Sequence, residues 1–203
     1  MNLYSIFPTA VARFELGREH TAKEIAFVNR QKTYNNEGNT TSNDRYVLRK
    51  DAMTGMREFV EASVNDYLQS VYAPKNEVNL RITQSWLNYC KPGQWHHKHA
   101  HPNSFISGVL YMKASRERDK IHFYRDGYQQ IKLPTNNWNL HNSESWWFEV
   151  GAGDLILFPS HLTHMVTTVQ EERVSLSFNT FPVGYVGEEE SMTALHLQNL
   201  KVS

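Results

Sequence analysis

Apolar residues recur along the chain at two different spacings, and the change falls near residue 80. Before it, Thr21 and Glu24 have the spacing of a capping box ahead of apolar positions 25, 27 and 28, which predicts a helix. Asp51 is expected to cap a second helix. Its apolar stripe, which we expect to pack against a sheet, comprises Met53, Met56, Val60, Val64, Tyr67, Leu68 and Val71. The polar segment 31–46 between the helices predicts a surface loop.

After residue 80, short runs of β-branched and aromatic residues predict strands. These runs are residues 81–89, 105–113, 121–125, 146–150, 154–159, 165–169 and 173–181. No helical pattern separates them, so we expect one sandwich or barrel, with the two helices covering one face. The aromatic and polar connection 126–145 has no clear period, and we expect it to form a rim or lid over a pocket.

Composition excludes several classes of protein. The 21 Lys and Arg residues balance 21 Asp and Glu residues, so the formal net charge of zero argues against a bulk nucleic-acid binder. Cys90 is the single cysteine, which rules out a disulfide within the chain and favours a reducing, cytoplasmic setting. The amino terminus lacks the pattern of a signal peptide, and no apolar run approaches the roughly 18 residues that a membrane-spanning helix needs.

Four histidines, His96, His97, His99 and His101, fall within six positions. In a strand, residues two apart point to the same face, so either His99 with His101 or His97 with His99 presents two imidazoles for chelation. Neutral imidazole suits iron, zinc, copper and nickel alike. A solvated histidine-rich loop is the alternative. The cluster leads directly into an apolar strand, which favours the metal site.

A third ligand is expected from the segment 151–166. Its buried apolar strand ends at Pro159, and His161 or His164 follows. A histidine just beyond the end of a strand would lie at the mouth of a barrel, where an open coordination position is useful.

Strand alternation places Arg173, Ser175 and Ser177 on one face of the last predicted strand. An arginine that points inward needs an anion to offset its desolvation, and guanidinium binds a carboxylate through two parallel hydrogen bonds. Ser175 can add a third. The alternative is that Arg173 lies in solvent or pairs with Glu171 or Glu172.

The order of these parts resembles the 2-oxoglutarate/Fe(II)-dependent oxygenases, and in particular a bacterial and phage branch of them. The resemblance rests on the segments 85–89 (SWLNY), 99–112 (HAHPNSFISGVLYM), 153–164 (GDLILFPSHLTH) and 173–179 (RVSLSFN). It implies one oxygenase domain over residues 1–203, with a double-stranded β-helix (a jelly-roll, cupin-like core) at about 81–183. Helical support would occupy about 1–75 and a tail 184–203. It also implies a bacterial or phage-encoded protein of the cytoplasm.

The resemblance also implies a site and a reaction. Its metal ligands would be His99, His101 and His164, and its co-substrate residues Arg173, Ser175, Asn88 and Tyr111. His101 stands where the family has Asp or Glu, which leaves the third ligand open. The cofactors would be Fe(II), 2-oxoglutarate and O2. The reaction would hydroxylate an unidentified substrate and release succinate and CO2, with no catalytic residue beyond the metal centre.

Two other functions fit parts of the pattern. Gly93 with His99 and His101 resembles the first cupin motif, and the segment 153–164 resembles the second, although the cupin glutamate is missing. A cupin-type metalloenzyme that does not use 2-oxoglutarate is therefore one alternative. A non-catalytic metal- or ligand-binding β-domain is the other. The segment 173–179 favours the oxygenase. A homodimer is possible, and a nucleic-acid partner is not expected.

Overall fold

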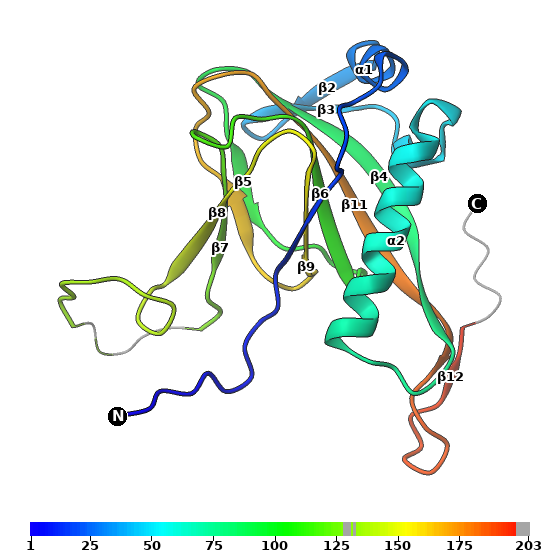
Figure 1. Ribbon diagram of the computed structural model, residues 1–203, viewed down its shortest axis with the longest axis vertical. Helices are drawn as coiled ribbons and strands as arrows, with labels where there is room; N and C mark the ends of the chain where they lie inside the picture. The colour runs from blue at the N-terminus through cyan, green and yellow to red at the C-terminus, as the bar shows by residue number, and fades with distance from the viewer. Residues whose placement is uncertain (128–130, 132, 198–203) are drawn as a thin grey trace.

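Two antiparallel sheets form the body of the molecule (Figure 1). The computed structural model describes residues 1–127, 131 and 133–197. In spatial order the larger sheet comprises β1 (Ala12–Glu15), β9 (Asp154–Pro159), β6 (Ile106–Lys113), β11 (Arg173–Val186), β4 (Val78–Cys90), β3 (Asn39–Ser42) and β2 (Thr33–Asn36), and β12 (Leu195–His196) pairs with β11. The smaller sheet comprises β5 (His96–His99), β10 (His164–Val166), β7 (Lys120–Tyr124) and β8 (Ser145–Glu149). The predicted mainly β class is confirmed.

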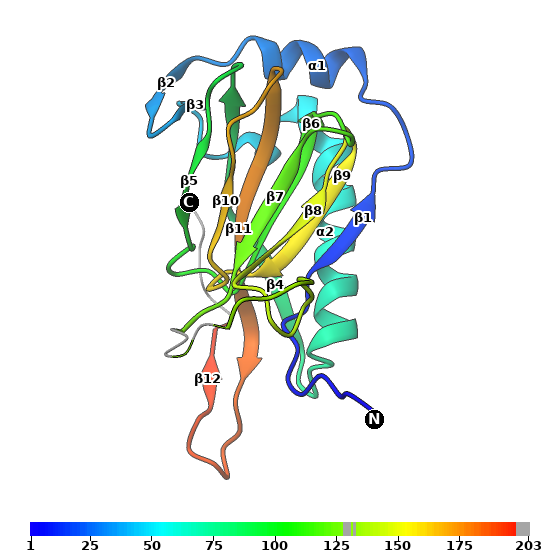
Figure 2. The same ribbon diagram turned by 90° about the vertical axis from the view of Figure 1, so that its left-hand side faces the viewer.

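The helices and the smaller sheet lie on opposite sides of the larger sheet. Figure 2 shows the smaller sheet in front and α2 (Thr54–Val71) behind the larger sheet, with α1 (Ala22–Asn29) at one end. Two short 3-10 turns, η1 (Val47–Arg49) and η2 (Asp51–Met53), lead into α2. None of the described helices is long and apolar enough to cross a membrane.

Both helices begin near the predicted positions, but only one has the predicted cap. In α1 the Glu24 backbone N–H donates to the Thr21 hydroxyl, and the Glu24 carboxylate accepts from the Thr21 N–H, which confirms the capping box. The prediction for Asp51 is wrong. Asp51 lies in η2, and α2 begins after Met53 without a side-chain cap, because the extra turn displaces the aspartate from the capping position.

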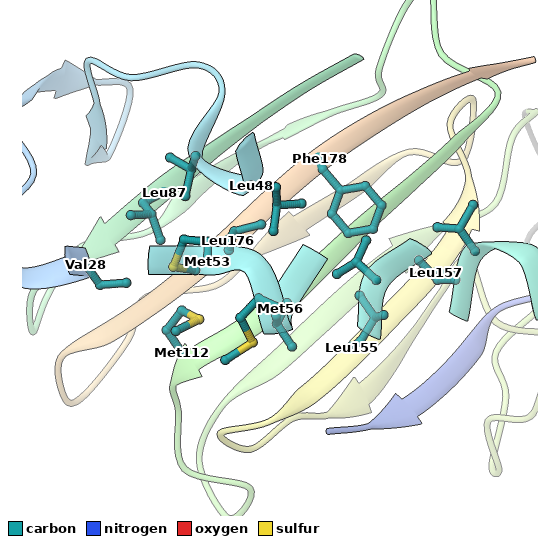
Figure 3. Packing of buried hydrophobic residues seen from close by; sticks show 14 of the residues in the cluster. Val28, Leu48, Met53, Met56, Leu87, Met112, Leu155, Leu157, Leu176 and Phe178 are labelled. Carbon is teal, nitrogen blue, oxygen red and sulfur yellow. The ribbon is translucent and has the colours of Figure 1, made fainter. Parts of the chain in front are cut away.

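The main core lies between α2 and the larger sheet. The predicted stripe on α2 is buried except at Val71, which is exposed. Met53, Met56, Leu176 and Phe178 belong to one buried cluster (Figure 3). The core also constrains β6, because a Cβ at Gly108 would lie 2.2 Å from the Phe178 ring.

The two faces of β11 separate apolar from polar chemistry as predicted. Val174, Leu176 and Phe178 belong to the core beside the helices. Arg173, Ser175 and Ser177 alternate with them and point toward the smaller sheet, where they line a cavity. The alternation confirms the period-two pattern of this strand.

The surface loop predicted over residues 31–46 is wrong, because this segment contains the hairpin of β2 and β3. Thr41 and Ser42 are buried. The Thr41 hydroxyl donates to the Leu87 carbonyl oxygen (3.0 Å), and the Ser42 hydroxyl accepts from the Leu87 N–H (3.0 Å). Polar side chains are tolerated in this interior because β4 satisfies their hydrogen bonds.

The tip of this hairpin is joined to the histidine-bearing segment. The Trp95 backbone N–H donates to the Gly38 carbonyl oxygen (3.0 Å). Gly38 has a φ of +83°, and a Cβ there would lie 2.6 Å from the Trp95 carbonyl oxygen. Only glycine therefore fits at this position without movement of one segment.

Strand boundaries differ from the predictions in a few places. β9 has the predicted bounds, whereas the run predicted over 165–169 is the shorter β10. β1 and β5 were not predicted as strands, and β1 joins the larger sheet beside β9. The division of the chain into support, core and tail stays a prediction.

Candidate metal centre

A cavity of about 250 Å³ lies between the two sheets. Both sheets contribute polar side chains to its wall, and the connection after β5 contributes one histidine. All seven residues that the sequence predicted as metal or co-substrate ligands line it, namely Asn88, His99, His101, Tyr111, His164, Arg173 and Ser175. The fold therefore brings five separate stretches of chain to one place.

His99 and His164 face each other across paired strands. They are direct partners in the register of β5 and β10, and their ring centroids are 4.4 Å apart. His99 Nδ1 lies 2.8 Å from the His97 carbonyl oxygen, and His164 Nδ1 lies 3.0 Å from that of Leu162. A carbonyl oxygen only accepts, so each Nδ1 carries the proton. The Nε2 of each neutral ring therefore keeps a lone pair for a metal.

His101 completes the group from the connection that follows β5. Its backbone N–H donates to the Ser160 carbonyl oxygen (2.9 Å), which holds the connection beside β9. Its Nε2 lies 3.3 Å from Nε2 of His164. Ligand nitrogens of His99, His101 and His164 all lie within 4.8 Å of one another. Two nitrogens that bind one metal at about 2.1 Å lie roughly 3–3.5 Å apart. The pair of His101 and His164 has this spacing, so the group could hold a metal ion.

Burial keeps these imidazoles neutral. Desolvation, followed by the neighbouring His99, lowers the pKa of His164 to about 3 and that of His101 to about 4. Desolvation also lowers the pKa of His99. A neutral imidazole is the form that binds metal, so the three rings are held ready as ligands near pH 7.

A second histidine group overlaps the first. Ligand nitrogens of His96, His97 and His99 also lie within 4.8 Å of one another, and His99 belongs to both groups. Nδ1 of His97 is buried without a hydrogen-bond partner. The structure therefore brings together both pairs that the sequence left open. His161, the alternative to His164, is exposed.

Arg173 is buried on the opposite wall, with 2% of its surface exposed. Its guanidinium donates to the Tyr111 hydroxyl oxygen (3.2 Å) and to the Lys120 carbonyl oxygen (3.3 Å). No carboxylate of the described residues forms an ion pair with Arg173. Glu171 pairs with Arg118, and Glu172 pairs with Lys113. The alternative of a solvent-exposed or Glu-paired Arg173 is therefore wrong, and the cavity holds a buried guanidinium that an anionic ligand would stabilise.

Three polar residues form one row beside Arg173. Ser175 on β11 lies opposite both Asn88 on β4 and Tyr111 on β6. The Asn88 side-chain amide donates to Ser177 Oγ (3.0 Å), whereas its buried Oδ1 has no hydrogen-bond partner. Such unsatisfied atoms are uncommon in folded proteins, and a ligand in the cavity would satisfy this one.

Residues 84–179 match the family described as "Putative 2OG-Fe(II) oxygenase". This matched stretch contains the whole set of candidate ligands. Over this stretch, which is 96 of the 203 residues, the chain is similar to the 2OG-Fe(II) oxygenases. No match was found among curated proteins.

Solved structures of several oxygenases share the fold of this chain. HygX from Streptomyces hygroscopicus, with nickel, 2-oxoglutarate and hygromycin B bound, has a TM-score of 0.57 at 11% identity, over 85% of this chain and 82% of that chain. A prolyl hydroxylase from Trichoplax adhaerens, in complex with a peptide fragment, has a TM-score of 0.57 at 12% identity, over 84% of this chain and 83% of that chain. A prolyl-4-hydroxylase from Pseudomonas putida has a TM-score of 0.54 at 14% identity, over 84% of this chain and 92% of that chain. The predicted jelly-roll core is confirmed.

Sequence reasoning missed one wall of this cavity. Tyr34, Asn36 and Thr41 from the β2–β3 hairpin line it, together with Arg45 just beyond. The turn around Gly38 was a signal for a hairpin, but nothing in the local pattern indicated its place beside the histidines.

The predicted lid is not part of this cavity. Of the connection 126–145, no described residue lines it; residues 128–130 and 132 lie outside the described part. A larger cavity, of about 730 Å³, lies beside α2 and the first half of β4, but its described lining includes no histidine.

Proposed function

We propose that this oxygenase binds Fe(II) through His99, His101 and His164 and binds 2-oxoglutarate against Arg173, to hydroxylate a substrate that the comparisons do not identify. One observation carries the proposal. Three neutral imidazoles, of which His164 is buried and the other two are partly buried, line the same 250 Å³ cavity as a buried guanidinium that has no ion-pair partner among the described residues. The cupin-type metalloenzyme is the second candidate, and the family match favours the oxygenase.

We assign the metal to the group that contains His164 rather than to the group of His96 and His97. Two members of the first group have an Nδ1 hydrogen bond to a carbonyl oxygen, which orients the rings and leaves each Nε2 free. His164 also comes from a different strand than His99, so the pairing of β5 with β10 holds these two together without a metal.

The co-substrate would occupy the row of polar groups between the metal ligands and Arg173. Its distal carboxylate would accept two hydrogen bonds from the guanidinium and one from Ser175. Tyr111 Oη already accepts from Arg173, so its own proton is available for the same carboxylate. Burial raises the pKa of Tyr111 to about 12, which keeps that proton in place. Asn88 closes the other side of the row.

When bound, the iron would activate O2 with electrons from the decarboxylation of 2-oxoglutarate, which releases succinate and CO2. The chain itself would orient the reactants and exclude water. Val109, Ile121 and Val166 provide buried apolar parts of the wall, and Trp86 lies 5.9 Å from the His101 ring, centroid to centroid. A small dry cavity of this kind strengthens the electrostatic contacts inside it.

We infer a cytoplasmic, bacterial or phage-encoded enzyme. Cys90 is a free, buried thiol, which suits a reducing compartment. A homodimer stays a prediction.

The test is an anaerobic titration of the Fe(II) protein with 2-oxoglutarate, followed by the metal-to-ligand charge-transfer absorption. The wild-type protein should develop the band. His164→Ala should lose most of its iron, and Arg173→Gln should keep iron while needing far more 2-oxoglutarate. His161→Ala, which changes an exposed histidine three positions away, is the matched control and should behave as wild type. Unchanged iron content in His164→Ala would overturn the proposal.

A further inference from the structure

The described lining of the cavity contains no acidic side chain. Its charged members are Arg45 and Arg173, and its five histidines are His96, His97, His99, His101 and His164. Asp44, the acid next to Arg45 in the chain, lies 3.0 Å from the Lys50 ammonium and accepts from the Tyr46 N–H (2.8 Å). The cavity therefore has an excess of positive charge.

Arg45 is held in place by the β2–β3 hairpin. Its guanidinium carbon lies 4.7 Å from the centroid of the Tyr34 ring. One of its terminal nitrogens, Nη1, donates to the Ser42 carbonyl oxygen (3.0 Å) and to the Thr41 hydroxyl oxygen (3.4 Å). The other nitrogens have no hydrogen-bond partner among the described residues. Such a preorganised guanidinium loses little freedom when it binds an oxyanion.

The proposed metal set adds to this excess. Iron(II) held by three neutral imidazoles would keep its two positive charges, whereas a carboxylate in place of His101 would remove one. Two charges from iron and one each from Arg45 and Arg173 make four, and the dianion of 2-oxoglutarate would offset two of them. Two positive charges remain to be offset in a cavity between two sheets, where unpaired charge is costly.

We propose, on the basis of the proposed function, that Arg45 binds an oxyanion of the primary substrate, which makes that substrate a carboxylic or phosphoric acid. Arg173 then binds the co-substrate, and Arg45 binds the primary substrate. The cavity volume of about 250 Å³ is below the usual range of roughly 300–1,000 Å³ for whole-ligand pockets, so a small molecule or the acidic end of a larger one would enter.

The test measures binding rather than turnover. The anaerobic protein, with Fe(II) and saturating 2-oxoglutarate, is titrated with two series of acids and followed by calorimetry and by shifts of the charge-transfer band. One series runs from acetate to hexanoate, each paired with its carboxamide, and the other from methyl to butyl phosphate, each paired with its alcohol. At least one acid should bind about tenfold or more tightly than its neutral partner, and the two series distinguish carboxylate from phosphate.

Arg45→Gln should abolish the preference for the acid, and Arg45→Lys should retain part of it. Arg49→Gln is the matched control, because Arg49 also lies over a tyrosine ring, that of Tyr46 at 4.5 Å, but lines the cavity beside α2. It should leave the preference unchanged. Equal binding of acids and neutral partners by wild type, or an unchanged preference in Arg45→Gln, overturns this inference. If 2-oxoglutarate itself gives no band, the proposed function fails and this inference fails with it.

Discussion

His101 would determine the charge of the proposed metal centre. It occupies the position where the resemblance predicts a carboxylate, yet its Nε2 lies 3.3 Å from that of His164. Because burial lowers the pKa of His101 to about 4, it presents a lone pair rather than a charge. A histidine here would therefore conserve a metal-binding atom while changing the charge of the centre by one.

We predict that His101→Ala loses several-fold in Fe(II) affinity, whereas His101→Asp retains iron, because aspartate also offers a ligand atom at this position. Iron per protein after anaerobic loading and desalting measures both effects. His161→Asp controls for added negative charge at an exposed site. Wild-type iron content in His101→Ala would show that two histidines suffice and that His101 is not a ligand.

At the scale of single elements, the sequence was informative wherever local pattern and burial agree. The capping box of α1 and the alternation of β11 follow from contacts within a few residues. The β2–β3 hairpin was missed because its burial depends on hydrogen bonds to Leu87, more than forty residues away. The resemblance named His99, His101 and His164, whereas the local pattern left the choice among neighbouring histidines open, because that choice depends on the pairing of β5 with β10.

Strand β6 packs so closely on β11 that one methyl group should disturb the core. A Cβ at Gly108 would lie 2.2 Å from Phe178 and 2.7 Å from Leu157, and both neighbours are buried. Gly108→Ala should lower the free energy of unfolding by about 1–3 kcal/mol or more, as measured by urea denaturation. Gly55→Ala in α2 is the control, since its Cβ meets only flexible side-chain ends, and it should not destabilise. Equal stability of both variants would contradict the packing described here.

At the scale of the whole molecule, the proposed ligands divide between the two sheets. His99 and His164 belong to the smaller sheet, and Arg173 belongs to the larger one. A metal alone would therefore stabilise one sheet and the connection that follows β5. 2-Oxoglutarate bound to that metal would link the two sheets.

Because of this division, the two ligands should raise the melting temperature in two successive increments. Fe(II), added anaerobically, should raise the melting temperature, and 2-oxoglutarate should raise it further only when metal is present. A ligand at a hundred times its Kd raises the free energy of unfolding by about 2.7 kcal/mol. Arg173→Gln should keep the first increment and lose most of the second. A full effect of 2-oxoglutarate on the metal-free protein would contradict the arrangement.

The contact between Gly38 and Trp95 joins the hairpin that holds Arg45 to the segment that contains the histidines. The wall that would select substrates is therefore not an independent module on a fixed scaffold. Exchanging this hairpin to redirect the enzyme would also shift the support of the metal ligands. A new hairpin would have to keep the glycine at its tip, so specificity and metal binding must change together.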